Sequence, residues 1–108
     1  MALRLTLVIA LAIAALTLTP PGAPQPGMPG FDKLVHMLAF AVLAMPMAYA
    51  RRLAVWQVVL ASLAFGGMIE LIQPFVGRSG EWADLLADGL GASGGAWVAA
   101  RVGRGRVV

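Results

Sequence analysis

Carboxylate, imidazole and cationic side chains are concentrated in a few short stretches of an otherwise apolar chain. Of its 108 residues, 60% are hydrophobic and 12% are charged. Four of the five acidic residues lie between positions 69 and 95, inside or beside apolar segments. Ionisable groups at membrane depth are costly unless they are partnered, so they usually mark a functional site. The residues that could do chemistry are Asp32, Lys33, His36, Glu70, Gln73, Arg78, Asp84 and Asp88.

The spacing of these residues places them on shared helix faces. His36 follows Asp32 by four residues, and Gln73 follows Glu70 by three. Residues three and four apart are neighbours on a helix surface. In the last apolar segment, Asp84, Asp88, Gly91 and Gly95 lie on one helix face. The small glycines on this face let another helix approach closely. The glycines expected to make such contacts are Gly66, Gly67, Gly91 and Gly95.

Four apolar segments carry these residues, and we expect helices at about 4–19, 32–50, 53–76 and 83–101. Each is close to the roughly 20 residues that cross a bilayer. Segment 20–30 holds five prolines and three glycines and cannot be helical, so it is predicted to be an outward loop. The chain 1–108 is therefore predicted to be a single all-α domain. It would be an integral membrane protein with four transmembrane helices in a compact bundle.

The first apolar run, Leu5–Thr19, has two interpretations. A cleaved signal peptide has the same composition, with one arginine before an apolar stretch. However, no A-x-A cleavage site follows, because the run ends in Thr19-Pro20-Pro21. We therefore expect a retained first helix.

The basic residues predict the orientation in the membrane. With four spans, both termini lie on one side, and six arginines flank that side, whereas only Lys33 and Arg78 flank the other. The positive-inside rule then places both termini in the cytoplasm. The six are Arg4, Arg51, Arg52, Arg101, Arg104 and Arg106. Because they cap apolar runs, the net charge of +3 does not indicate a nucleic-acid partner.

This topology gathers the polar residues near the outer membrane face. A rise of about 1.5 Å per residue puts His36, Glu70 and Asp88 about 6–9 Å from the outer ends of their helices. The favoured hypothesis is binding or catalysis at that face. His36, Glu70, Asp84 and Asp88 would be catalytic, with Glu70 or Asp84 as proton acceptor and His36 as its partner. The residues expected to bind or support an anionic ligand are Asp32, Lys33, Gln73 and Arg78.

Two other functions remain open from the residues alone. The cluster could move protons or cations, because acid–histidine chains form relays in membranes, although the inner half of the third segment offers only Gln57 and Ser62. It could also be structural, pinning three helices together by ion pairs. Whether the protein is an enzyme stays undecided. We assign no metal site and no cofactor, because no compact metal motif such as H-E-x-x-H occurs and the chain has no cysteine. Binding of a divalent cation stays open, since the sequence offers carboxylate and imidazole donors at Asp32, His36, Glu70, Asp84 and Asp88.

The ordered set of motifs resembles the VanZ-like family of small bacterial membrane proteins. The motifs are Asp32-Lys33-x-x-His36, Glu70-x-x-Gln73, Arg78 in a short loop, and Asp84-Leu-Leu-Ala-Asp88 before a glycine-rich helix. Asp88 departs from the family pattern, which often has Asn there. The family is named after a member associated with teicoplanin resistance. The resemblance implies a bacterial plasma-membrane protein with a cell-envelope role, with membrane lipids and an anionic envelope precursor as partners.

Overall fold

The computed structural model describes residues 1–18, 31–77 and 82–106, and all regular structure in these ranges is helical. The all-α fold with four main helices, predicted from the sequence, is confirmed. The elements are α1 (Ala2–Leu18), α2 (Phe31–Tyr49), α3 (Val55–Ile72), the short 3₁₀ helix η1 (Gln73–Val76) and α4 (Trp82–Arg106).

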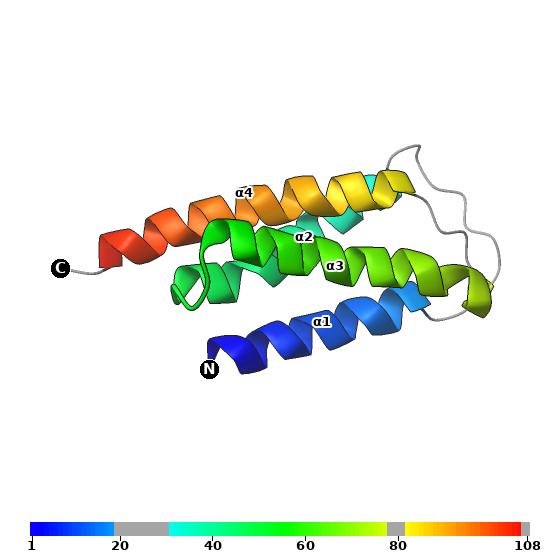
Figure 1. Cartoon of the computed structure of the whole chain (residues 1–108), viewed down its shortest axis with the longest axis horizontal. Helices are drawn as coiled ribbons and strands as arrows, with labels where there is room; N and C mark the ends of the chain where they lie inside the picture. Colours follow the sequence, from blue (N-terminus) through cyan, green and yellow to red (C-terminus); the bar gives the residue numbers. More distant parts are fainter. Residues whose placement is uncertain (19–30, 78–81, 107–108) are drawn as a thin grey trace.

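The helices lie side by side along the long axis of the molecule (Figure 1). The α2–α4 contact is the most extensive, α3 packs on α4, and α1 packs mainly on α2. One end of the bundle, here called the terminal end, holds the start of α1, the α2–α3 turn and the end of α4 (Figure 1). The opposite, distal end holds the start of α2, η1 and the start of α4.

Three predicted helix boundaries differ from the structure, and the two differences at the third helix have a local cause. The third helix begins at Val55 rather than at 53, because the chain first closes a turn after α2. Its last residues form η1 instead of α-helix, since Pro74 has no N–H to donate to the preceding turn. The fourth helix passes the expected end at 101 and continues to Arg106.

Glycines on α4 bring its backbone against the backbone of α2. A Cβ at Gly91 would overlap the carbonyl of Met37, and a Cβ at Gly95 would overlap the carbonyl of Ala41. Gly103 repeats this contact farther along the pair. The predicted close contact through Gly91 and Gly95 is therefore confirmed, and α2 and α4 pack more closely than larger residues would permit.

The exposed side chains of the bundle are largely apolar, whereas some of the buried ones are polar. The core contains small residues such as Ala44, Ala92 and Ala96 around the fully buried Phe40. Large apolar side chains point outward on every described α-helix, for example Leu11, Leu38, Leu60 and Leu90. The buried polar residues are Ser62, Glu70, Gln73, Asp84 and Asp88. Exposed large apolar side chains on all four described α-helices are more than a soluble domain usually shows, and they suit nonpolar surroundings.

One described helix is long and apolar enough to cross a membrane. It covers Val55–Val76, with a mean hydropathy of 1.8. The described apolar parts of the first two helices, Ala2–Leu18 and Lys33–Tyr49, are shorter. The predicted four membrane crossings thus remain a prediction. Two aspartates and several glycines lower the hydropathy of α4, although its acidic side chains are buried against neighbouring helices.

The glycine contact makes a prediction about stability. Changing Gly95→Ala should destabilise the fold by about 1–3 kcal/mol, because the new methyl group must push α2 and α4 apart. The matched variant Gly94→Ala points into open space on the same helix. It should raise stability by about 1 kcal/mol, since alanine favours helix over glycine. Thermal unfolding of the detergent-purified protein measures both; equal midpoints for the two variants would contradict the observed contact.

Candidate functional site

Charged side chains from three helices meet at the distal end of the bundle. The first turns of α2 supply Lys33 and His36, α3 supplies Glu70 near its end, and α4 supplies Asp84 and Asp88. The three carboxylates are nearly inaccessible, with Asp88 only 1% exposed. We call these five residues the polar cluster. Residues that are far apart in the sequence therefore come together as one buried group.

His36 is the centre of the polar cluster. Its Nδ1 lies 2.9 Å from Asp88 Oδ1, which is hydrogen-bond distance, and either atom can carry the shared proton. Its Nε2 lies 3.6 Å from Asp84 Oδ2, close enough for an ion pair but too long for a good hydrogen bond. The imidazole thus bridges two carboxylates that stand one turn apart on α4.

Lys33 connects the polar cluster to its surroundings. Its Nζ lies 2.8 Å from Asp84 Oδ1. The Lys33 side chain is 29% exposed, whereas the side chain of Asp84 is 8% exposed. The ion pair therefore joins a partly accessible cation to a buried anion. The short Lys33–Asp84 distance makes this lysine the partner of Asp84 Oδ1.

Glu70 closes the polar cluster from α3. One ligand atom each from His36, Glu70 and Asp88 lies within 4.8 Å of the others. An imidazole and two carboxylates are donors that divalent cations accept. By distance and chemistry this group could hold a metal ion, and its three members are among the five candidate donors identified from the sequence.

Phe40 and Gly66 shape the polar cluster, and neither was predicted as a site residue. The Phe40 ring is stacked with the His36 ring, with centroids 6.5 Å apart and planes 8° apart. A Cβ on Gly66 would lie 2.7 Å from Asp88 Oδ2, so glycine makes room for that carboxylate. The sequence did hold a signal for both: Phe40 follows His36 by four residues and Gly66 precedes Glu70 by four, which places each on the same helix face as its neighbour. Gly67 meets open space, and its predicted close contact is wrong.

The remaining predicted site residues have other positions. The Gln73 side chain is buried, and its Nε2 donates a hydrogen bond of 3.2 Å to the carbonyl of Thr17, which fastens η1 to the end of α1. Its amide nitrogen is thus used within the fold rather than held for a ligand. Asp32 lies in the first turn of α2, with its side chain outside what the structure describes. Arg78 lies outside the described residues.

Comparison with known proteins identifies the family. The VanZ/LLP1 family model matches residues 3–103, which include all but the first residue of α1 and all five residues of the polar cluster. The chain belongs to the VanZ/LLP1 family. No curated protein and no solved structure matches the chain.

In this VanZ/LLP1 member, the polar cluster combines two chemical capacities. The His36–Asp88 pair holds a proton between a base and an acid, which is the arrangement of a general acid–base pair. The Lys33 ammonium offers a positive charge to an anion at the edge of the same group. A ligand held at Lys33 would therefore lie beside groups that can exchange a proton.

The His36–Asp88 pair should behave as one unit in unfolding. Either His36→Ala or Asp88→Ala leaves a buried polar partner orphaned, whereas the double variant removes both. We expect the double variant to be more stable than the sum of the single effects predicts, by about 1.5–3 kcal/mol. Thermal unfolding of the four proteins in detergent measures this coupling.

A control cycle combines His36→Ala with Ser93→Ala. Ser93 is exposed on α4, and its hydroxyl donates to the carbonyl of Gly89. These two changes should add to within about 0.5 kcal/mol. Additive behaviour of His36 and Asp88 as well would mean that the pair contributes no specific interaction.

Proposed function

We propose that this VanZ-like protein crosses the bacterial plasma membrane four times, with both termini in the cytoplasm and the distal end facing outward. At that end the polar cluster binds or processes an anionic envelope component, such as a lipid headgroup or a cell-wall precursor. Through this activity the protein would influence susceptibility to glycopeptide antibiotics such as teicoplanin, as the family resemblance implies.

The distribution of side chains supports the membrane placement. Large apolar residues face outward on α1, α2, α3 and α4, while the acidic residues of α3 and α4 are buried. Trp56 and Trp82 are exposed in the first turns of their helices, at opposite ends of the bundle. Exposed tryptophans at helix ends suit the two membrane interfaces. The six arginines of the cytoplasmic side in the proposed topology complete this pattern.

The observation that carries the proposed chemistry is the continuous series of charged contacts from Lys33 through Asp84 and His36 to Asp88. An anionic group that binds Lys33 competes with Asp84 for the ammonium. Asp84 then turns to the Nε2–H of His36, which favours transfer of the shared proton toward the imidazole. Anion binding at the surface is thereby coupled to proton position at Asp88, with Arg78 as a second cation for the ligand.

Transport across the membrane receives no comparable support. The two polar residues that could extend a path along α3 are engaged within their own helix. Ser62 Oγ donates to the carbonyl of Val58, and Gln57 Oε1 accepts from the N–H of Ala54. A purely structural role for the ion pairs is the alternative that the experiments below must separate from binding.

The orientation can be tested with introduced cysteines, because the natural chain contains none. We expect Gly27→Cys to react with a membrane-impermeant maleimide added to intact spheroplasts, since the proline-rich segment would face outward. Val108→Cys should react only after the membrane is permeabilised. The reverse labelling pattern, or equal labelling of the two, would contradict the proposed topology.

The function of the polar cluster can be tested with Glu70→Gln, Asp84→Asn and Arg78→Ala in a teicoplanin-sensitive host. Each variant should keep normal membrane abundance and lose the change in susceptibility that the natural protein confers, because each removes a charge needed for binding or proton transfer. Quantitative immunoblots and inhibitory concentrations measure the two properties.

Ser93→Ala provides the matched control on α4 and should behave like the natural protein. Low abundance of all three charge variants would instead support a structural role for the polar cluster. Normal abundance together with unchanged susceptibility would show that the polar cluster does not act in this process.

A further inference from the structure

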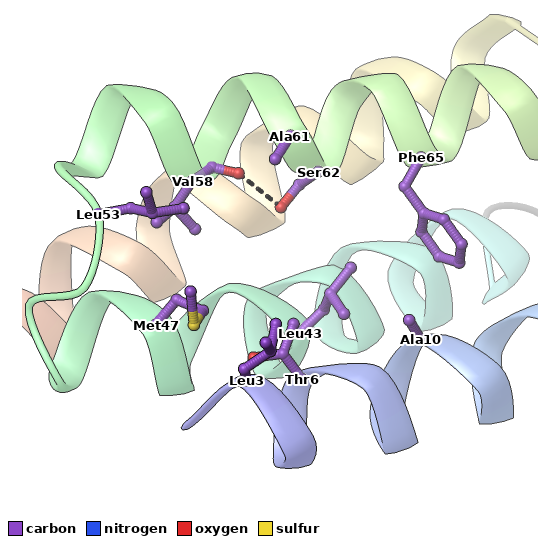
Figure 2. A pocket seen from close by; sticks show the side chains of 10 residues that line it. All are labelled: Leu3, Thr6, Ala10, Leu43, Met47, Leu53, Val58, Ala61, Ser62 and Phe65. Carbon is purple, nitrogen blue, oxygen red and sulfur yellow. Dashed lines mark hydrogen bonds between the residues drawn. The ribbon is translucent and has the colours of Figure 1, made fainter. Parts of the chain in front are cut away.

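The terminal end of the bundle, opposite the polar cluster, carries two adjacent hollows. The first has a volume of about 260 Å³ and lies between α1, α2 and α3 (Figure 2). Its walls are mainly apolar side chains, including Leu3, Leu43, Met47 and Phe65. We call it the apolar hollow. It is somewhat smaller than a typical ligand pocket of about 300–1,000 Å³, so its size suits one hydrocarbon chain rather than a whole lipid.

The polar atoms in the wall of the apolar hollow are already used. The lining side chains include the hydroxyls of Thr6 and Ser62. Thr6 Oγ1 donates to the carbonyl of Ala2 at 2.8 Å, and Ser62 Oγ donates to the carbonyl of Val58 at 2.8 Å. Figure 2 shows the second of these bonds running along α3. With both hydroxyl protons engaged, the hollow offers little to a polar ligand and suits an alkyl chain.

The second hollow is basic. It has a volume of about 440 Å³, and its lining includes Arg51 and Arg52 from the α2–α3 turn, Arg104 from the end of α4, and Gln57. Leu53 lines both hollows, so the two are neighbours at this residue. Three arginines line this one hollow, and a guanidinium group is the planar donor that phosphate groups prefer.

The backbone at Arg51 favours glycine, yet the position holds arginine. Arg51 has φ of 58° at the end of α2. Its N–H bonds to the carbonyl of Ala48, and the N–H of Arg52 bonds to the carbonyl of Met47, which is a Schellman arrangement. Glycine usually occupies the left-handed position of this motif, because a side chain there is strained. Residues held in a strained backbone conformation often lie at functional sites, so the arginine at this position is consistent with a binding role for its side chain.

We infer that the two hollows form one binding site for an anionic phospholipid, with the phosphate among the three arginines and one acyl chain in the apolar hollow. Leu53 lies where the headgroup meets the chain. The site depends on the proposed membrane placement, in which the terminal end faces the cytoplasmic leaflet. It is separate from the polar cluster. Basic pockets between helices at this leaflet suit anionic headgroups.

The combination of hollows favours a lipid over a soluble phosphate compound. Arginines alone would bind either one. The apolar hollow adds affinity only for a ligand that carries a hydrocarbon chain, since burying that chain removes apolar surface from water. The expected preference is therefore for a ligand with both a negative headgroup and an acyl chain.

Native mass spectrometry of the full chain in a neutral detergent tests this site. Dioleoylphosphatidylglycerol should bind more tightly than dioleoylphosphatidylcholine, and glycerol phosphate should bind only weakly. The double variant Arg51→Gly/Arg104→Gln should weaken binding of the anionic lipid by about 25-fold, at about fivefold for each arginine. Ala61→Phe, at an exposed position in the wall of the apolar hollow, should also weaken it.

The controls separate lipid binding from folding and from the polar cluster. Arg51→Gly suits the left-handed backbone, so the thermal midpoint of the double variant without lipid should not fall. Arg101→Gln removes an arginine at the same end that lies over the Trp97 ring, 5.1 Å from its centroid, and should leave lipid affinity unchanged. Asp84→Asn should also bind lipid normally, whatever its effect on antibiotic susceptibility.

Three results would overturn the inference. The first is equal affinity for the two phospholipids, which would exclude a role for the arginines. The second is glycerol phosphate binding as tightly as the phospholipid, which would exclude a role for the apolar hollow. The third is a double variant that binds like the natural protein.

Discussion

The close packing of α4 against α2 is the constraint on which the rest of the structure depends. Gly91 and Gly95 bring the two backbones into contact at Met37 and Ala41. At this short separation, side chains at the distal end of one helix reach those of the other, and His36 meets Asp88. Larger residues in the glycine stripe would separate the helices, and the hydrogen bond and ion pairs between them would lengthen.

The buried charges and the apolar exterior are two consequences of one arrangement. Two helices that carry carboxylates can place them in an apolar bundle only if the carboxylates face inward and find partners. Here the two carboxylates of α4 find their partners on α2, as an ammonium and an imidazole on adjacent turns. The outward faces are then left to leucine, valine and tryptophan. The polar cluster therefore orients α2, α3 and α4 about their own axes.

The two ends of the bundle differ in chemistry. The distal end buries carboxylates beside a histidine, whereas the terminal end gathers arginines around a hollow that adjoins an apolar one. In a membrane, this asymmetry would place a proton-exchanging group in one leaflet and a site for an anionic headgroup in the other. The same basic residues that set orientation would then also contact lipid.

Much of this architecture could be predicted from the sequence because the signals are local. Apolar runs separated by a proline-rich segment and by short polar stretches predict the four helices, and the spacing of Asp84, Asp88, Gly91 and Gly95 predicts one packed stripe. Boundaries near Val55 and Arg106 were missed, since turn closure and helix continuation depend on neighbouring contacts. Gln73 was assigned to the ligand site, but its amide nitrogen reaches the end of α1, more than fifty residues away in the chain.

The sequence by itself determined the helical class, the family and the set of residues that could meet at one end, because residue type and helical period are properties of short segments. Tertiary structure alone decided which partner each charge has. Pairing of His36 with Asp88 and of Lys33 with Asp84 depends on the rotation and spacing of whole helices. Those quantities follow from the backbone contact of α2 and α4, and no spacing within one segment encodes them.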